Sequence, residues 1–239
     1  MFETAVGSDT LILNVIAHIH TDFHDKFGIP RQSGLADTKG KIVFEPEYRN
    51  SDMIRGIEEY SHLWIMWGFS DNFGKEWHPT VRPPRLGGNK RIGVFATRSP
   101  FRPNPIGLSC VKLEKVEKTE DKGYILCVTG ADLKNGTPIY DIKPYLPYVD
   151  AHPEAEGGFA QKKKDYELAG EFPVHLLENV PEDHRKTLKQ VLAQDPRPSY
   201  QNDPERIYRM GYAGLEVRFQ VSKGKLKVCD VFKIENAGG

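Results

Sequence analysis

Residues 80–109 read TVRPPRLGGNKRIGVFATRSPFRPNPIGLS and differ in composition from the rest of the chain. They include five arginines, one lysine and five prolines, and no acidic residue occurs between Glu76 and Glu114. Because proline fixes φ and has no backbone N–H, most of this stretch can be neither helix interior nor central strand. Residues 91–97 alternate as a strand does, so we expect one strand that ends at the turn of residues 98–100. A strand that delivers a rigid, arginine-rich loop to the end of a sheet is more typical of a binding site than of a solvated charged surface.

The whole chain has the composition of an ordinary globular protein. Its 239 residues are 38% hydrophobic and 28% charged, which is enough for one large β domain or for a main domain with a smaller second one. Without a long apolar run or a signal peptide, we expect a cytoplasmic protein that has no membrane partner. The formal net charge of zero argues against a protein held on nucleic acid by its overall charge, although a local cationic patch can still dock one stem.

Short strand-like segments recur through the first two thirds of the chain, with one short helix expected over residues 50–60. Short strands without long intervening helices predict an antiparallel or mixed barrel rather than a doubly wound α/β sheet. The chain also lacks GxGxxG and P-loop motifs, so a nucleotide cofactor would not be held in the Rossmann manner. The expected strands are residues 11–20, 42–44, 62–69, 91–97, 106–116, 124–130 and 138–142.

Polar, glycine-bearing residues 151–170 predict a linker between two domains. We therefore expect a mainly β protein with α/β additions, in which residues 1–160 form a β-barrel domain and residues 170–239 form a small α+β domain. In the second domain we expect a strand over 171–176, then a helix that opens at Pro181 and runs to about Gln194.

A hairpin is expected at the end of the chain, with its turn at Lys223-Gly224. Asp230 falls in phase with the apolar residues of the second strand, so it either needs a buried partner or lies at an edge that reaches solvent. Those apolar residues are Leu226, Val228, Phe232 and Ile234.

Cysteine and histidine give only weak metal signals. His18, His20 and His24 form HxHxxxH, but no carboxylate or cysteine pattern completes a site, and we expect no metal. The three cysteines are far apart in apolar segments, which predicts buried thiols rather than a disulfide. They are Cys110, Cys127 and Cys229.

The segments RPPRLGGN (82–89) and GVFATRSPFRPNPIGLS (93–109) resemble the signature of the TsaA-like (TrmO) family of tRNA methyltransferases. Further matches in the same order cover nearly the whole chain. They are PRQSGL (30–35), SHLWI (61–65), NGTPIYDIKPYLPY (135–148) and AQDPRPSY (193–200). The resemblance implies a β-barrel enzyme that uses S-adenosyl-L-methionine to methylate the exocyclic N6 amine of a threonylcarbamoyladenosine next to the anticodon, at position 37. It also implies a homodimer and a tRNA anticodon stem-loop as partner.

The resemblance also implies where the cofactor binds. By charge, Arg98 suits the carboxylate of S-adenosylmethionine, and the apolar Leu108 suits its adenine. At two positions the chain departs from many relatives, which carry Asp where it has Asn135 and His where it has Ser70. The implied cofactor contacts are Ser33, Gly34, Leu35, Ser70, Asp71, Arg98, Leu108, Asn135, Gly136, Thr137 and Pro138.

The segment DPRPSY (195–200) has the parts that an acceptor site needs. The adenine amine is a poor nucleophile, so a catalyst would place hydrogen-bond acceptors against its N–H bonds as the methyl arrives. We assign Asp195, Arg197 and Tyr200 to this catalytic role. The alternative is structural, with Asp195 as a cap where the helix stops.

The cationic residues of the arginine-rich stretch are candidates for contacts with tRNA phosphates. They are Arg82, Arg85, Lys90, Arg91 and Arg102. An unpaired anticodon-loop base could stack on an aromatic ring, although each candidate ring could instead pack in the core. The candidates are Phe101, Tyr145, Tyr148 and Tyr200. Two other functional hypotheses are a noncatalytic RNA-binding barrel and a metal hydrolase built on the histidines.

Overall fold

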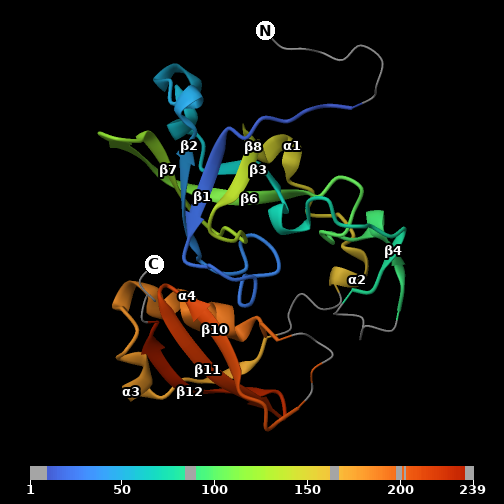
Figure 1. The fold of residues 1–239 in the computed structure, drawn as a ribbon, viewed down its shortest axis with the longest axis vertical. Coiled ribbons are helices and arrows are strands. Elements are labelled where there is room, and N and C mark those ends of the chain that lie inside the picture. The colour runs from blue at the N-terminus through green and yellow to red at the C-terminus, as the bar shows by residue number, and fades with distance from the viewer. Residues whose placement is uncertain (1–9, 84–89, 162–166, 198–200, 202, 235–239) are drawn as a thin grey trace.

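The computed structural model describes residues 10–83, 90–161, 167–197, 201 and 203–234. Its first part is a closed six-stranded barrel in the order β1-β2-β7-β6-β3-β8, in which all neighbouring strands are antiparallel (Figure 1). The expectation of a non-Rossmann barrel is confirmed. The strands are β1 (Ala17–Thr21), β2 (Lys39–Phe44), β3 (His62–Gly68), β6 (Ile106–Thr119), β7 (Gly123–Thr129) and β8 (Thr137–Pro144).

The barrel interior is filled by β-branched and aliphatic side chains at alternate strand positions. Burying each such side chain contributes roughly 1.5–3 kcal/mol, which is why the period-2 pattern of these strands is decisive. Those almost completely buried include Ile19, Ile42, Leu63, Ile65, Val111, Leu126 and Ile139. Gly107 on β6 is needed for another reason, since a Cβ there would lie 2.3 Å from the Trp67 ring. The absence of a side chain at Gly107 therefore lets the indole lie flat across β6.

Short helical turns connect the strands. Asn50 is the N-cap residue of one of them, and its side chain accepts a hydrogen bond from the Asp52 N–H. The single helix expected over residues 50–60 is instead two 3-10 turns, because Gly56 between them has a φ of 85°. The turns and short helices are η1 (Pro46–Tyr48), η2 (Ser51–Ile54), η3 (Ile57–Glu59), η4 (Ser70–Asn72), α1 (Pro147–Asp150) and α2 (Gly158–Gln161).

The prediction of one strand over residues 91–97 is wrong in its extent. Only β5 (Ile92–Gly93) is extended, and it pairs with β4 (Thr80–Val81) in a two-stranded ribbon that stands apart from the barrel (Figure 1). The chain then turns through η6 (Val94–Ala96), which closes when the Thr97 hydroxyl donates to the Val94 carbonyl at 2.8 Å. The alternating residues that suggested a longer strand do not pack against a second sheet, and Phe95 is 80% exposed. Arg98 consequently projects from a turn rather than from a strand end.

The C-terminal part is a four-stranded sheet in the order β10-β11-β12-β9 with two helices. The helix predicted from Pro181 is confirmed, with Pro181 as its N-cap residue. The strand predicted over 171–176 ends at Glu171, because Pro173 begins a short helix instead. The elements are β9 (Ala169–Glu171), α3 (Val174–Leu177), α4 (Glu182–Ala193), β10 (Tyr208–Tyr212), β11 (Leu215–Ser222) and β12 (Lys225–Lys233).

A bulge in β12 changes which side chains face the core. Arg218 pairs with Asp230 and the next residue, Phe219, pairs with Val228, so Cys229 is an extra residue on β12. An extra residue reverses the inward and outward alternation beyond it. Asp230 is therefore turned from the core, and Val231 is buried where Phe232 was expected. Cys229 is exposed and the other two cysteines are half-buried, so the prediction of three buried thiols is wrong.

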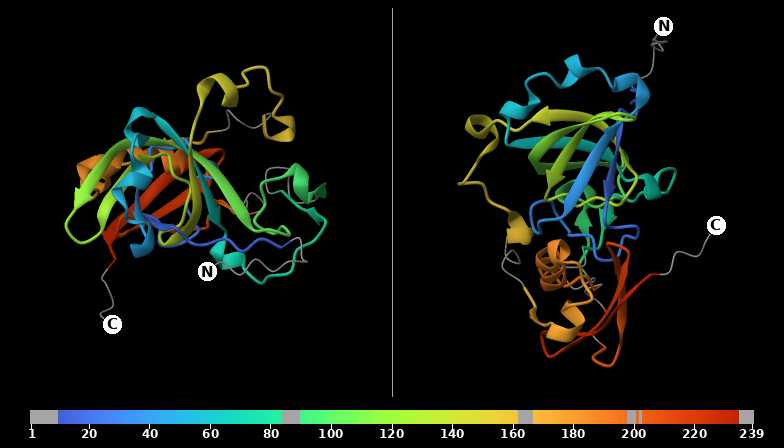
Figure 2. Two further views of the ribbon diagram at one scale, coloured as in Figure 1. Left: turned by 90° about the horizontal axis from the view of Figure 1, so that it is seen from above. Right: turned by 90° about the vertical axis from the view of Figure 1, so that its left-hand side faces the viewer.

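The two parts are joined by the loop between β1 and β2, which lies between the barrel and the C-terminal sheet (Figure 2). Phe23 and Ala36 of this loop are buried in the hydrophobic core of the C-terminal part, together with residues of α4 and the sheet. Gly28 is held against Met210, where a Cβ would lie 2.4 Å from the sulfur. The domain boundaries at residues 160 and 170 stay a prediction. None of the helices that the structure describes is long and apolar enough to cross a bilayer.

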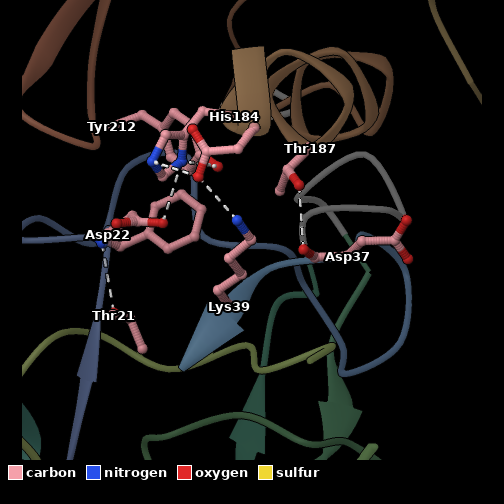
Figure 3. Close-up of polar contacts among 9 residues, drawn as sticks. Thr21, Asp22, Asp37, Lys39, His184, Thr187 and Tyr212 are labelled. Atoms are coloured by element: carbon pink, nitrogen blue, oxygen red, sulfur yellow. Dashed lines mark hydrogen bonds and ion pairs between the residues drawn. The ribbon is translucent and has the colours of Figure 1, made fainter. Parts of the chain in front are cut away.

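Polar contacts reinforce this junction (Figure 3). The Asp37 N–H donates to Gln190 Oε1 at 2.9 Å, and Gln190 Nε2 donates back to the Asp37 carboxylate at 3.1 Å. The Thr187 hydroxyl donates to the Asp37 carbonyl at 3.1 Å. Helix α4 therefore holds the backbone and the side chain of a single loop residue.

A second set of polar contacts surrounds His184 in the same figure. Its Nδ1 lies 3.5 Å from an Asp22 carboxylate oxygen and 3.3 Å from the Tyr212 hydroxyl. Burial raises the pKa of the Asp22 carboxyl and also the pKa of the Tyr212 phenol. Lys39 of β2 reaches Asp183 at the start of α4, at 2.9 Å.

We expect Gln190→Ala to lower the free energy of unfolding by about 1–2 kcal/mol, because the Asp37 N–H loses its acceptor at a partly buried junction. Urea denaturation followed by tryptophan fluorescence measures the change. Lys189→Ala, on the exposed side of α4, is the matched control and should leave stability nearly unchanged. Equal stability of the two variants would show that this contact does not hold the two parts together.

Candidate functional site

A cavity of about 1070 Å³ lies between one end of the barrel and the C-terminal part. Its walls come from distant segments: the β1–β2 loop over residues 26–32, the end of β3 with η4, the arginine-rich loop and the end of α4. This volume is at the upper end of the range for ligand pockets, so a bound nucleotide-sized molecule would leave space for part of a second ligand.

One wall of the cavity is aromatic and aliphatic. The rings of Trp67 and Phe69 pack edge to face with centroids 4.3 Å apart. This wall is extended by Ile106 and Leu108 of β6 and by Phe95 of η6. Such a surface suits the flat face of a heterocyclic base.

Two arginines of the arginine-rich loop line the cavity. Arg98 donates through Nη1 to the side-chain oxygen of Gln32, and its side chain is otherwise exposed. Arg102 is half-buried and donates to the Thr97 carbonyl at 3.2 Å. The turn that carries both is braced where the Ser99 N–H donates to the Thr97 hydroxyl. A guanidinium held in this way is prepared to bind a carboxylate or a phosphate.

Asp71 in η4 is neutralised by two lysines. Its carboxylate lies 3.4 Å from Lys26 and 3.3 Å from Lys134, and all three residues line the cavity. Burial raises the pKa of Asp71, but the hydrogen bonds from Lys134 and Lys26 outweigh it and hold the pKa below its usual value. The group carries one net positive charge.

Asp132 is a second cavity carboxylate, and the sequence analysis did not single it out. Its Oδ1 accepts a hydrogen bond from the Ser109 hydroxyl at 2.5 Å. Ser109 in turn accepts from the Trp67 indole N–H at 2.9 Å. Burial raises the pKa of Asp132, against the opposing effects of Ser109 and Arg98. The only signal in the sequence was an acidic residue between the apolar Ala131 and Leu133.

The residues implied as cofactor contacts fall into two groups. One group lines the cavity and consists of Ser70, Asp71, Arg98, Leu108 and Thr137. The other group does not line the cavity and belongs to the β1–β2 loop, the turn before β8 and the start of β8. It consists of Ser33, Gly34, Leu35, Asn135, Gly136 and Pro138. The Asn135 side chain, at one of the departures from the family pattern, accepts from the Thr21 N–H at 3.1 Å and so holds the turn before β8.

The segment after α4 is built around an internal ion pair. Asp195 binds Arg197 through two hydrogen bonds, from Nε at 2.8 Å and from Nη2 at 2.9 Å, and both residues are 8% exposed. Arg31 Nη2 donates to the backbone carbonyls of both residues. Asp195 has a φ of 51°, and its N–H donates to the Leu192 carbonyl. It is therefore the left-handed residue that ends the helix, a position where glycine is usual.

The same segment reaches the cavity through Pro196 and Arg197, and the guanidinium of Arg197 also lies 5.9 Å from the centre of the Tyr208 ring. Asp195, which binds Arg197, is not itself a lining residue. Tyr200, the third residue assigned to the acceptor, lies outside the described residues.

The predicted phosphate contacts lie along the β4–β5 ribbon and the following loop. Arg82, Lys90 and Arg91 are exposed, and Arg91 donates to the Thr80 hydroxyl at 2.9 Å. Arg102 faces the cavity, whereas Arg85 lies outside the described residues. The exposed side chains are accessible to a large anionic ligand.

The remaining candidates differ in their surroundings. His18 lies 2.6 Å from Glu45, and the described part of the chain contains no group of His, Cys, Asp and Glu side chains arranged to hold a metal. The Tyr145 ring packs against Trp64 with centroids 5.8 Å apart. Phe101 is 49% exposed and Tyr148 is 85% exposed, so these two rings are accessible for stacking.

Together, these features define a class of protein: an antiparallel β-barrel with a non-Rossmann cavity suited to a nucleotide-like ligand, beside a cationic surface. A family model described as the tRNA-methyltransferase O N-terminal domain matches residues 18–151, and the TrmO C-terminal domain model matches residues 171–234. The chain belongs to the tRNA-methyltransferase O family.

Similar proteins cover both parts of the chain. A protein of Escherichia coli (strain K12) is 41% identical over 222 residues, which cover 89% of this chain and 94% of the relative. One of Eikenella corrodens is 47% identical over 177 residues, which cover 74% and 99%. Both are described as tRNA (adenine(37)-N6)-methyltransferase. A crystal structure of TrmO from Pseudomonas aeruginosa has a TM-score of 0.76 and 32% identity, and the match covers 95% of this chain and 99% of that one.

Proposed function

We propose that this protein transfers a methyl group from S-adenosyl-L-methionine to the exocyclic N6 amine of the adenine at position 37 of tRNA, and that the cavity is the site of transfer. The observation that carries the proposal is the meeting of two segments about a hundred residues apart: Arg98 of the arginine-rich loop and Arg197 of the DPRPSY segment line the same cavity. One side can hold a cofactor while the other receives a base.

The side chains of the cavity fit the cofactor. Arg98 matches its carboxylate, and the wall formed by Trp67, Phe69 and Leu108 matches its adenine. When bound, S-adenosylmethionine would supply the electrophilic methyl group. The backbone turns at Gly34 and Gly136, with φ of 77° and 78°, shape the loops around this end of the cavity. The remaining residues assigned to the cofactor, from Ser33 to Pro138, would act as direct contacts or as supports for these loops.

The acceptor base would lie against the DPRPSY segment. In this proposal the Asp195 carboxylate would accept a hydrogen bond from the N6 amine, which raises the electron density on nitrogen. The new N–C bond would form as the methyl–sulfur bond breaks, and the N6 proton would be lost. A carboxylate oxygen can accept more than one hydrogen bond, so the Asp195–Arg197 pair is compatible with this contact. Arg197 fixes its orientation, and Tyr200 would stack on the base.

Docking of the anticodon stem-loop would use the exposed cations of the β4–β5 ribbon. The exposed side chains of Arg82, Lys90 and Arg91 would meet phosphates, and Arg85 is assigned the same role. Arg102, which lines the cavity, would contact the nucleotide nearest the site. Because the chain has a formal net charge of zero, binding would depend on this patch.

The proposal extends to a cytoplasmic homodimer whose substrate adenosine already carries a threonylcarbamoyl group. The family resemblance supports the dimer. The exposed aromatic side chain of Trp77, which is 46% exposed, provides apolar surface that a second copy could cover.

We expect Arg98→Ala to weaken S-adenosylmethionine binding by about tenfold or more, because the cofactor carboxylate loses a charge-assisted partner. Arg82→Ala, which removes an exposed arginine of the β4–β5 ribbon, is the matched control and should stay within about twofold of the parent protein. Isothermal calorimetry gives both dissociation constants. If the parent protein does not bind the cofactor at all, the alternative of a noncatalytic RNA-binding barrel takes precedence.

We expect Asp195→Asn to slow single-turnover methylation by about a hundredfold while the dissociation constant of the cofactor stays nearly unchanged. Loss of the buried pair with Arg197 will also lower stability, so both measurements are made where circular dichroism shows a folded variant. Asp230→Asn, in the same part of the chain, is the control. A normal rate in folded Asp195→Asn would leave Asp195 as a helix-terminating residue alone.

For the RNA surface, we expect the triple variant Arg82→Ala, Lys90→Ala and Arg91→Ala to reduce the slope of log affinity against log salt concentration by about one for each phosphate that is no longer neutralised. Fluorescence anisotropy with a labelled anticodon stem-loop measures the slope. A slope equal to that of the parent protein would move the docking surface elsewhere.

A further inference from the structure

The connection between β7 and β8 holds Asp132 in a fixed backbone position at the cavity wall. The Thr38 hydroxyl donates to the Ala131 carbonyl just before Asp132, and the Thr21 hydroxyl donates to the Leu133 carbonyl just after it, at 3.0 Å. The flanking side chains of Ala131 and Leu133 are each 1% exposed. The backbone that carries Asp132 is therefore anchored on both sides before any ligand binds.

The Asp132 side chain is oriented by a chain of two hydrogen bonds. An indole N–H can only donate, so Trp67 donates to Ser109, and the Ser109 hydroxyl must direct its own hydrogen to Asp132. Both partners lie on neighbouring barrel strands, Trp67 on β3 and Ser109 on β6. Trp67 pairs with Gly107 and Ser109 pairs with Ile65, so the two side chains come from diagonal positions of one strand pair. A carboxylate whose rotamer is locked by rigid strands is preorganised in the manner of a ligand contact.

The charges of the cavity distinguish Asp132 from Asp71. Asp71 is paired with two lysines, whereas Asp132 forms no ion pair with any residue that the structure describes. Arg98 is close enough to favour its charged form, but burial has the larger effect and raises the pKa of Asp132. The Asp132 carboxylate accepts the Ser109 hydrogen bond and also backbone hydrogen bonds, including one from Ser33. A neutral amide or carbonyl could accept these without the desolvation of a charge. A cationic group of a ligand would offset that desolvation.

We propose that Asp132 binds the α-ammonium group of S-adenosylmethionine, with Ser109 and Trp67 as its positioning residues. The inference rests on the proposed function, in which Arg98 takes the carboxylate of the same amino-acid end. Arg98 and Asp132 line the same cavity, so their opposite charges are complementary to those of a zwitterion. The ammonium hydrogens donate to the carboxylate, and the aromatic wall is left for the adenine.

Three ligands separate the possible roles of Asp132 by calorimetry: S-adenosylmethionine, S-adenosylhomocysteine and 5′-methylthioadenosine. The first two carry the ammonium group, and only the first is a sulfonium. The third lacks the amino-acid end. We expect Asp132→Asn to weaken binding of the first two by about thirtyfold and to leave 5′-methylthioadenosine unchanged. The exposed carboxylate variant Asp121→Asn should bind all three as the parent protein does.

Three results would overturn the inference. Weaker binding of S-adenosylmethionine alone would place Asp132 at the sulfonium, and equally weaker binding of all three ligands would mean a structural role. The third result is unchanged binding of all three. If the parent protein binds none of them, the proposed function itself fails. Should Asp132→Asn not fold, Ser109→Ala provides the test. It keeps the carboxylate but removes the hydrogen bond that orients it, so it should weaken the two amino-acid ligands by about threefold or more and spare 5′-methylthioadenosine. Unchanged binding of all three ligands would overturn the positioning role of Ser109.

Discussion

Burial of Phe23 in the core of the C-terminal part is the constraint on which the arrangement of this protein depends. Phe23 leaves the barrel directly after β1, yet its ring packs against Tyr212 with centroids 5.3 Å apart. Together with Ala36 it draws both ends of the β1–β2 loop into that core, and Asp37 is then held by α4. This loop brings Arg31 and Gln32 to the cavity. The distance between the barrel and the end of α4 is therefore set by apolar packing, and the cavity lies in the space that remains.

Several charged side chains that line the cavity are paired within the protein, and these pairs support the walls of the site. Asp195 and Arg197 form one such pair, in which Arg197 reaches the cavity, and Asp71 holds Lys26 and Lys134 in place. Internal pairs of this kind give a site its shape at a desolvation cost that the pairing offsets. The side chains then left to meet a ligand are few, which makes the effect of each one measurable.

Sequence periodicity predicted most of the barrel strands well, but β1 begins at Ala17 rather than at Leu11, and Leu11 and Ile12 are 80% and 82% exposed. It also failed where tertiary contacts changed the phase or the length of an element. The strands around Ile65 and Leu126 are buried on one face, so period-2 alternation was a reliable guide to them. Helix α4 was predicted from Pro181 because proline at a helix start and an apolar stripe are local signals. The strand expected over residues 91–97 has the same alternation but no sheet to pack on, and β12 contains a bulge that no local pattern announces.

The sequence by itself determined the fold class and, through several ordered motifs, the family, because alternation, proline positions and motif blocks are all properties of neighbouring residues. It also picked out Arg98 and the DPRPSY segment, whose composition is unusual over a short span. Only the tertiary structure decided that Arg98, Arg197 and Asp132 share one cavity, and that the Asp195 carboxylate binds Arg197. The physical reason is that these contacts depend on residues far apart along the chain. Their distances follow from how the barrel and the C-terminal sheet pack on a shared loop, and no local pattern encodes that packing.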